Sequence, residues 1–181
     1  MSVWLRHKAQ YATSIDEFLA IYDPADLPNQ DDALFGAVSN NNLDLKLSIT
    51  MRLLNDGASA AYVESGINVL HVLFGRMEAR RPEQEAPMVR ALIEAGADVN
   101  LYSRRYPTPL IMMLDEDHLP GEQSAPFYDV FLDRPELDLT LPVRYQSNRT
   151  VRDGLEYMAT HTRPFLGERL RLRDQKFGTT S

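Results

Sequence analysis

The chain has 181 residues, a formal net charge of −7 and no cysteine. This length allows one ordinary domain with a sizeable core, and 44% hydrophobic and 25% charged residues are typical of a soluble globular protein. The lack of cysteine excludes disulfides, thiolate zinc sites and thiol catalysis, and fits a reducing compartment. No apolar run is long enough to span a membrane and no signal peptide opens the chain, so we expect a cytoplasmic protein that binds no membrane.

The charge is unevenly distributed. Residues 161–181 hold five Lys and Arg against two Asp and Glu, a net of +3, which leaves −10 for the rest of the chain. An acidic body disfavours binding to nucleic acid or anionic lipid. It suits a basic protein partner, although acidity also serves solubility alone.

The first 31 residues are predicted to hold one helix. Residues 1–11 have no clear apolar period, whereas Ser14–Tyr22 has helical spacing and an N-cap at Ser14. This helix is suited to covering the end of the helices that follow. Its apolar face is Ile15, Phe18, Leu19 and Tyr22.

Two helices are predicted next, over residues 31–38 and 43–55, and the three asparagines of residues 40–42 separate them. Gly57 ends the second helix, because glycine takes the left-handed conformation without a Cβ penalty. We expect Leu34, Ala37 and Val38 to be buried in the first helix, and Leu47, Met51 and Leu54 in the second.

A short helix is expected through Val72–Phe74, with His71 in a structural role. A charged connection over residues 76–85 follows. Pro87 is then predicted to start a helix that ends at Gly96, as Gly57 ends the earlier one. Met88, Ala91, Leu92 and Ala95 share one face of this helix.

The next helix is predicted to begin at Pro109, with Thr108 as its N-cap. A loop over residues 115–124 separates it from a helix that ends before residue 135. The turn over residues 135–140 stands where residues 95–100 stood before, but without the glycine. The apolar residues expected inside are Leu110, Ile111, Met113 and Leu114 in the first helix, and Phe127, Val130, Phe131 and Leu132 in the second.

The last predicted helix begins at Thr150 and directs Leu155 and Met158 inward. After Pro164 we expect a short capping helix, followed by a disordered segment over residues 176–181. The spacing repeats along the chain, because 39 residues separate Gly57 from Gly96 and 40 separate Asp98 from Asp138.

The stretch Leu92–Asn100, followed by Thr108–Ile111, resembles the ankyrin repeat. The family pattern is Leu-Leu-x-x-Gly-Ala-Asp-Val-Asn, then a turn, then Thr-Pro-Leu-His. Gly66, Leu70 and His71 match the same pattern more weakly, and the unit of about 40 residues exceeds the roughly 33 of a plain ankyrin repeat. The Gly-Ala-Asp-Val-Asn signature argues against HEAT and tetratricopeptide repeats.

The resemblance implies an all-α ankyrin-repeat solenoid of helix-turn-helix units, with short hairpin-like turns and terminal capping helices. The single domain 1–181 would hold an N-terminal segment and capping helix (1–31), about four degenerate repeats (32–160) and a basic C-terminal cap and tail (161–181). In such a stack the protruding turns form one edge. Tyr and Arg dominate binding hot spots, so we predict a partner-binding surface at Tyr62, Tyr102, Arg104, Arg105, Tyr106, Arg144 and Tyr145.

The sequence holds little that could carry catalysis. Asp115, Asp117 and His118 form its only dense acid and histidine cluster, and a solvated loop is the better interpretation than a cation site. No nucleophile elbow, metalloprotease motif or phosphate-binding glycine loop occurs. We therefore expect no catalytic residues, no metal and no cofactor.

The predicted function is non-catalytic protein binding by a chain that is a monomer when free. The resemblance to stand-alone bacterial ankyrin proteins favours an immunity protein, which neutralises a cognate toxin with a basic active-site cleft. A general scaffold that recruits a cellular protein is the alternative. A metal-dependent enzyme that uses Asp115, Asp117 and His118 is the third hypothesis.

Overall fold

The structure is a computed structural model that describes residues 3–29, 32–76, 80–116, 118–119 and 121–178. These residues form ten α-helices, one 3₁₀ helix and no strand, so the all-α part of the predicted fold class is confirmed for them. The chain divides into two compact units. The first holds Met1–Arg76 and Pro87–Asp98, and the second holds Met77–Ala86 and Val99–Ser181.

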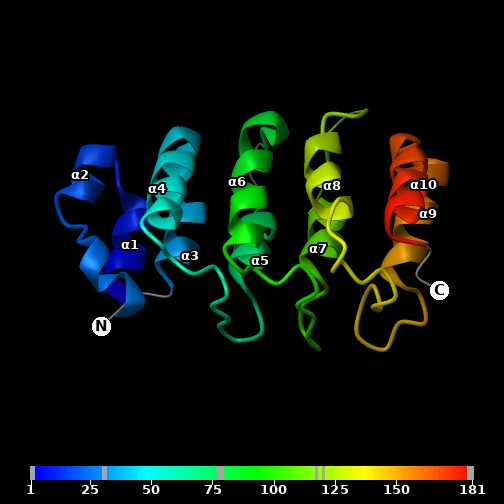
Figure 1. Ribbon diagram of the computed structural model, residues 1–181, viewed down its shortest axis with the longest axis horizontal. Coiled ribbons are helices and arrows are strands. Elements are labelled where there is room, and N and C mark those ends of the chain that lie inside the picture. Colours follow the sequence, from blue (N-terminus) through cyan, green and yellow to red (C-terminus); the bar gives the residue numbers. More distant parts are fainter. Residues whose placement is uncertain (1–2, 30–31, 77–79, 117, 120, 179–181) are drawn as a thin grey trace. The chain divides into compact units, whose positions relative to one another are not determined.

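The first unit is built around two neighbouring helices, α3 and α4, which Figure 1 shows in shades of blue and cyan. Helices α1 and α5 also pack against α3, and α2 packs against α4. Its elements are α1 (Val3–Tyr11), α2 (Ile15–Leu19), η1 (Pro24–Asn29), α3 (Ala33–Val38), α4 (Leu43–Asn55) and α5 (Val69–Phe74), with most of α6 (Pro82–Glu94).

Helix α1 is an addition to the sequence prediction, which found no period in residues 1–11. Leu5 and Ala9 are buried against α3, whereas Trp4 stays exposed. The contact is close because Gly36 of α3 has no side chain, and a Cβ there would overlap the main-chain carbonyl of Arg6. Because α1 packs so closely on α3, a narrow strip of small and apolar residues is enough to bury it. A strip this narrow gives no clear apolar period in the sequence.

Asn40 joins the C-terminal end of α1 to the loop after α3. Its side-chain amide donates to the carbonyl of Ala9 at 3.0 Å and to that of Ala12 at 3.2 Å, and its side-chain oxygen accepts from the Asn42 N–H at 2.8 Å. The residue is buried, so these bonds satisfy carbonyls that water does not reach. An asparagine predicted only to break a helix therefore also caps one.

Helix α4 has the predicted bounds but a different buried face. Leu45, Ile49 and Leu53 are buried, whereas Leu47, Met51 and Leu54, which were expected inside, are only half-buried. The prediction was wrong because both sets recur at helical spacing and either could face the core. Packing against α3 selects the first set.

Two helices of this unit end in the same way. In α4 the Ala58 N–H donates to the Leu53 carbonyl and the Gly57 N–H to the Leu54 carbonyl; in α6 the equivalent bonds run from Ala97 to Leu92 and from Gly96 to Ile93. This pair of bonds defines the Schellman motif. Its glycines have φ of +99° at Gly57 and +104° at Gly96, as predicted.

Helix α6 begins at Pro82 and contains Pro87, so the prediction that Pro87 starts the helix is wrong. Glu85 stabilises the added turn, because its buried carboxylate accepts from the Arg81 N–H at 2.7 Å and pairs with Arg80 at 3.2 Å. Pro82 has no N–H and its φ suits the first helical position. The start of α6 belongs to the second unit and the remainder to the first.

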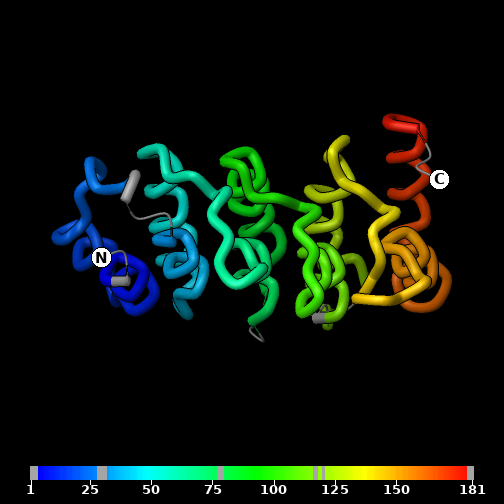
Figure 2. Tube along the Cα trace, turned by 90° about the horizontal axis from the view of Figure 1, so that it is seen from below, coloured from blue at the N-terminus to red at the C-terminus, as the bar shows by residue number. Residues whose placement is uncertain are grey.

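The second unit contains α7 (Pro109–Glu116), α8 (Ala125–Leu132), α9 (Val151–His161) and α10 (Phe165–Phe177). Helices α9 and α10 lie side by side, drawn in orange and red in Figure 2, and α10 also packs on α8. The predicted N-cap at Thr108 is confirmed, and Thr150, the predicted start of the last helix, is the N-cap of α9. Thr108 Oγ1 accepts from the Ile111 N–H at 3.4 Å, and Thr150 forms a capping box with Asp153.

The last helix is longer than expected, and its basic residues bind within the second unit. Helix α10 continues through Phe177, so the prediction of disorder is wrong for residues 176 and 177, while residues 179–181 lie outside the described part of the chain. Arg169 pairs with Asp129 at 2.6 Å, and Lys176 pairs with Asp133. The positive charge of residues 161–181 is thus used largely to hold α10 to its own unit.

None of the described helices combines the length and the apolar character needed to cross a membrane.

Candidate functional site

The first part of the candidate site is the loop that precedes α7. The Ser103 N–H donates to the Tyr106 carbonyl at 3.0 Å, and the Ser103 hydroxyl accepts from the Tyr106 N–H at 3.1 Å. These two bonds close a hairpin-like turn with Arg104 and Arg105 at its tip. Both arginines are exposed, and Tyr106 is half-buried.

The second part is the loop between α8 and α9. Pro142 and Thr150 form an isolated bridge at its base, and the Ser147 N–H donates to the Arg144 carbonyl at 2.9 Å near its tip. Arg144 and Tyr145 stand exposed at this tip. Two short turns with internal hydrogen bonds therefore present three exposed arginines and the exposed Tyr145, and Tyr106 lies half-buried in the first turn.

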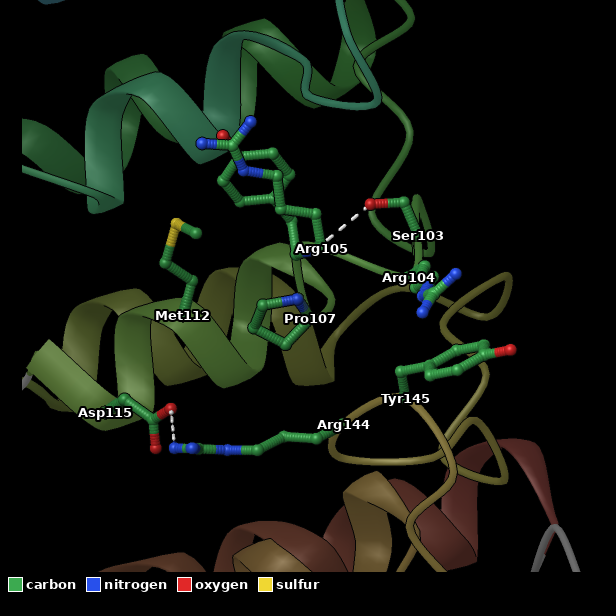
Figure 3. Close-up of a pocket in the computed structure, with 9 residues that line it drawn as sticks. Ser103, Arg104, Arg105, Pro107, Met112, Asp115, Arg144 and Tyr145 are labelled. Atoms are coloured by element: carbon green, nitrogen blue, oxygen red, sulfur yellow. Dashed lines mark hydrogen bonds and ion pairs between the residues drawn. The ribbon is translucent and has the colours of Figure 1, made fainter.

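These two turns and α7 enclose a recess of about 450 Å³. Figure 3 shows Arg144 extending towards Asp115 of α7, with Arg104 beside Tyr145. We call it the hairpin recess. It is lined by Ser103, Arg104, Arg105, Tyr106, Pro107, Met112, Asp115, Arg144 and Tyr145.

The guanidinium groups of the hairpin recess lie close to aromatic rings. The Arg104 guanidinium is 5.5 Å from the centre of the Tyr145 ring, and that of Arg105 is 5.4 Å from the centre of the Tyr106 ring. These distances fall within the range of cation–π contacts. The first contact joins the two turns to each other, because Arg104 belongs to one and Tyr145 to the other.

The hairpin recess is a basic site on an acidic chain. Three arginines and one aspartate line it, so its net charge is +2. Because the whole chain carries −7, the residues outside the recess carry −9. Asp115 pairs with Arg144 at 2.9 Å. Among the residues that the structure describes, no carboxylate pairs with Arg104 or Arg105.

The recess gathers five of the seven residues predicted to bind a partner, namely Arg104, Arg105, Tyr106, Arg144 and Tyr145. Tyr62 lies in the first unit, half-buried, with its ring edge-on to Phe35 at 5.4 Å. Tyr102 is half-buried outside the recess, and its hydroxyl is buried without a hydrogen-bond partner among the described residues. Neither of these two side chains lines the recess.

Four lining residues were not predicted as partner-binding. Met112 and Asp115 lie one turn apart on α7, and Ser103 and Pro107 flank the first tip. Only Asp115 carried a signal, as part of an acid cluster that we assigned to a solvated loop. Its helical position, three residues from Met112, places both side chains on one face.

The third hypothesis placed a metal ion at Asp115, Asp117 and His118. Asp117 lies outside the described residues, and Asp115 is engaged by Arg144. Within the described parts of the chain, no three His, Asp or Glu side chains are grouped so that they could hold a metal ion.

A second recess, of about 620 Å³, lies along α9 and α10. Three of its four charged residues pair with one another, since Arg152 donates to both oxygens of Asp174 at 3.0 and 2.6 Å and also pairs with Glu156 at 2.8 Å. The hydrogen bonds from Arg152 lower the pKa of Asp174. An ion-pair network of this kind has less capacity for a charged ligand than the hairpin recess.

Comparison with known proteins finds a similar fold and no protein of known function. No family model matches the sequence, and no curated protein matches it. The crystal structure of a functionally unknown protein from Leptotrichia buccalis C-1013-b is similar, with a TM-score of 0.73 at 16% identity over 98% of this chain and 96% of that chain. At this identity the likeness shows a shared fold alone, so the ankyrin resemblance remains a prediction from the sequence.

Proposed function

We propose that this chain is a non-catalytic protein-binding module built from ankyrin-type helix pairs. The matching helix ends at Gly57 and Gly96 support an ankyrin-type repeat, because the turns after α4 and α6 have the same two backbone hydrogen bonds. The turn that presents Arg104 supports it further, since it joins one such helix end to a Thr-Pro helix start at Thr108.

The observation that carries the proposal is the hairpin recess. Tyr145 is 49% exposed although it is a large aromatic side chain, and Arg104 lies against its ring. Exposed tyrosine beside arginine is the composition of binding hot spots, where a rigid ring and a planar donor group gain contact area at small entropic cost. The two turns are already held by backbone bonds, so binding orders little additional chain.

The narrower proposal is an inhibitor that neutralises a toxin, with recruitment of a cellular protein as the alternative. A surface formed before the partner arrives suits tight inhibition, because the cost of ordering is small. Both alternatives use the same recess, and they differ only in what happens to the partner's activity.

The test is affinity capture followed by an activity assay of whatever is captured. A Tyr106→Ala/Tyr145→Ala variant should hold the partner at least about tenfold more weakly, because hot-spot tyrosines contribute most of the binding free energy. Tyr157→Ala is the matched control, since Tyr157 is 48% exposed in the same unit but outside the recess.

Equal capture by the double variant and the wild-type chain would refute the assignment of the recess. Failure of the wild-type chain to hold any protein would refute protein binding itself. A captured partner that loses its activity identifies an inhibitor, whereas one that remains fully active identifies a scaffold.

A further inference from the structure

We infer that the hairpin recess takes an acidic segment of the partner, in which aspartate or glutamate carboxylates meet Arg104 and Arg105. The inference rests on the proposed function and specifies the chemistry of the partner at this site. It differs from the expectation drawn from net charge, in which an acidic chain meets a basic cleft. The local charge at the two tips is opposite in sign to the charge of the whole chain.

Arg104 and Arg105 are available for carboxylates. Both side chains are exposed, and each lies against a tyrosine ring rather than an acidic group. A guanidinium that lies against a ring keeps the edge that carries its N–H donors open to a further ligand. That planar edge matches the two oxygens of a carboxylate and forms paired, charge-assisted hydrogen bonds with them.

Arg144 adds a third cation that can change partner. Its pair with Asp115 lies at the surface, where the Arg144 side chain is 72% exposed and that of Asp115 is 44% exposed. Pairs this exposed are weak and are screened by salt. In the free chain Asp115 orients Arg144 towards α7, and a more buried carboxylate from a partner competes for the same guanidinium.

The remaining lining selects a protein segment. Pro107, Met112 and the Tyr106 ring give the recess an apolar wall beside its cations. This combination fits a peptide in which an acidic residue neighbours an apolar or aromatic one. A nucleic acid is disfavoured as the ligand. It would extend beyond the recess, where the net charge of −9 on the rest of the chain repels its phosphates.

The experiment is a selection from a library of random dodecapeptides displayed on phage, with the full-length chain as bait. Peptides selected by the wild-type chain should be enriched in Asp and Glu over the starting library. The Arg104→Glu/Arg105→Glu variant should lose this enrichment, and the best synthetic peptide should bind it at least about tenfold more weakly. Arg171→Glu is the matched control, because Arg171 is an exposed arginine of the same unit outside the hairpin recess.

Three further measurements make the result decisive. Thermal melts of all variants establish that each one folds. Binding of the synthetic peptide should weaken as salt is raised, since exposed charge pairs are screened. A fluorescently labelled single-stranded DNA of about twenty nucleotides, on the scale of an extended nucleic-acid site, serves as the competing ligand.

Selected peptides without acidic enrichment, or equal binding by the double variant and the wild-type chain, would overturn the inference. So would tighter binding of the DNA than of the best peptide at this recess. Each of these outcomes leaves the proposed function standing if the wild-type chain captures a protein through Tyr106 and Tyr145. The two ideas can therefore fail separately.

Discussion

Arg173 illustrates how much one side chain contributes to the second unit. At the end of α8 the Arg134 N–H reaches the Phe131 carbonyl at 3.1 Å, but Pro135 has no N–H for the second bond made in α4 and α6. Arg173 supplies donors to other carbonyls around this helix end. Its guanidinium donates to the carbonyls of Leu132, Arg134 and Leu137 at 3.0, 2.6 and 2.7 Å.

Replacing Arg173 with methionine is predicted to lower the free energy of unfolding by about 3 kcal/mol, because buried carbonyls would lose charged donors. The residue is 5% exposed, so water does not readily replace it. Urea denaturation measures the change. Arg171→Met is the control and should stay within about 0.5 kcal/mol, since its side chain is exposed; equal losses at both positions would contradict the cap.

No pattern in the sequence predicts that Arg173 is buried and caps a helix end. Residues 161–181 were recognised as basic, but whether a cation is solvated or buried depends on the neighbouring element. The same holds for Arg163, which donates to the Leu119 carbonyl at 3.1 Å. Caps formed within three residues, such as Ser14 and Thr150, were predictable because donor and acceptor share one short stretch.

At the scale of the element, the two glycine turns provide a matched pair. Gly57 and Gly96 have nearly the same φ, but a Cβ on Gly57 meets nothing, whereas one on Gly96 lies 3.4 Å from the Ala61 Cβ. Gly57→Val should cost roughly 2 kcal/mol through left-handed strain alone. Gly96→Val should cost more, about 3 kcal/mol, because its methyl groups also meet Ala61.

Chemical denaturation of both variants measures the difference between them. Stability equal to that of the wild-type chain would mean that neither helix ends in a left-handed residue. Equal losses at the two positions would show that the chain around Ala61 yields to the larger side chain.

The elements themselves were partly predictable. Helix α4 has its predicted bounds, Leu43–Asn55, because an asparagine cap and a glycine stop enclose one apolar period. The buried face of that helix was not predictable, since two stripes fit the helical spacing equally well. The start of α6 at Pro82 depends on the carboxylate of Glu85, which accepts a backbone hydrogen bond there. The packing of α1 depends on Gly36, which belongs to a different helix, α3.

The grouping of the candidate residues was predictable to the extent that they lie in protruding turns. The exposure of Arg104, Arg105 and Tyr145 could be predicted because tips between helix ends are solvated. Their role in binding a partner stays a prediction. Other tyrosines in similar turns are half-buried, namely Tyr62, Tyr102 and Tyr106. Whether a tyrosine in a turn packs inward or outward depends on contacts that are distant in sequence.

At the scale of the molecule, several carboxylates link stability to pH. The pKa of Asp56 is lowered by its hydrogen bond from Arg52, that of Asp174 by hydrogen bonds from Arg152, and that of Asp153 by a backbone hydrogen bond from Thr150. A lowered pKa in the folded state means that the contribution to stability is complete above the ordinary value of 3.8. It is lost as the pH falls through the folded-state value.

We therefore expect the melting temperature to stay nearly level between about pH 7 and 5 and to fall below about pH 4. Asp174→Asn should lower the melting temperature at neutral pH and make it less sensitive to acid. Differential scanning calorimetry across this range measures both effects. An unchanged acid response in the variant would contradict the role of the Arg152–Asp174 pair.

The position of Arg173 also bears on biosynthesis. A ribosome makes this guanidinium 36 to 41 residues after the carbonyls that receive it. Until then a nascent chain holds α8 with an open end, although the first unit, whose last residue is Asp98, is already translated. Translation that stalls before Arg173 is added would thus leave the second unit incomplete and open to proteases and chaperones.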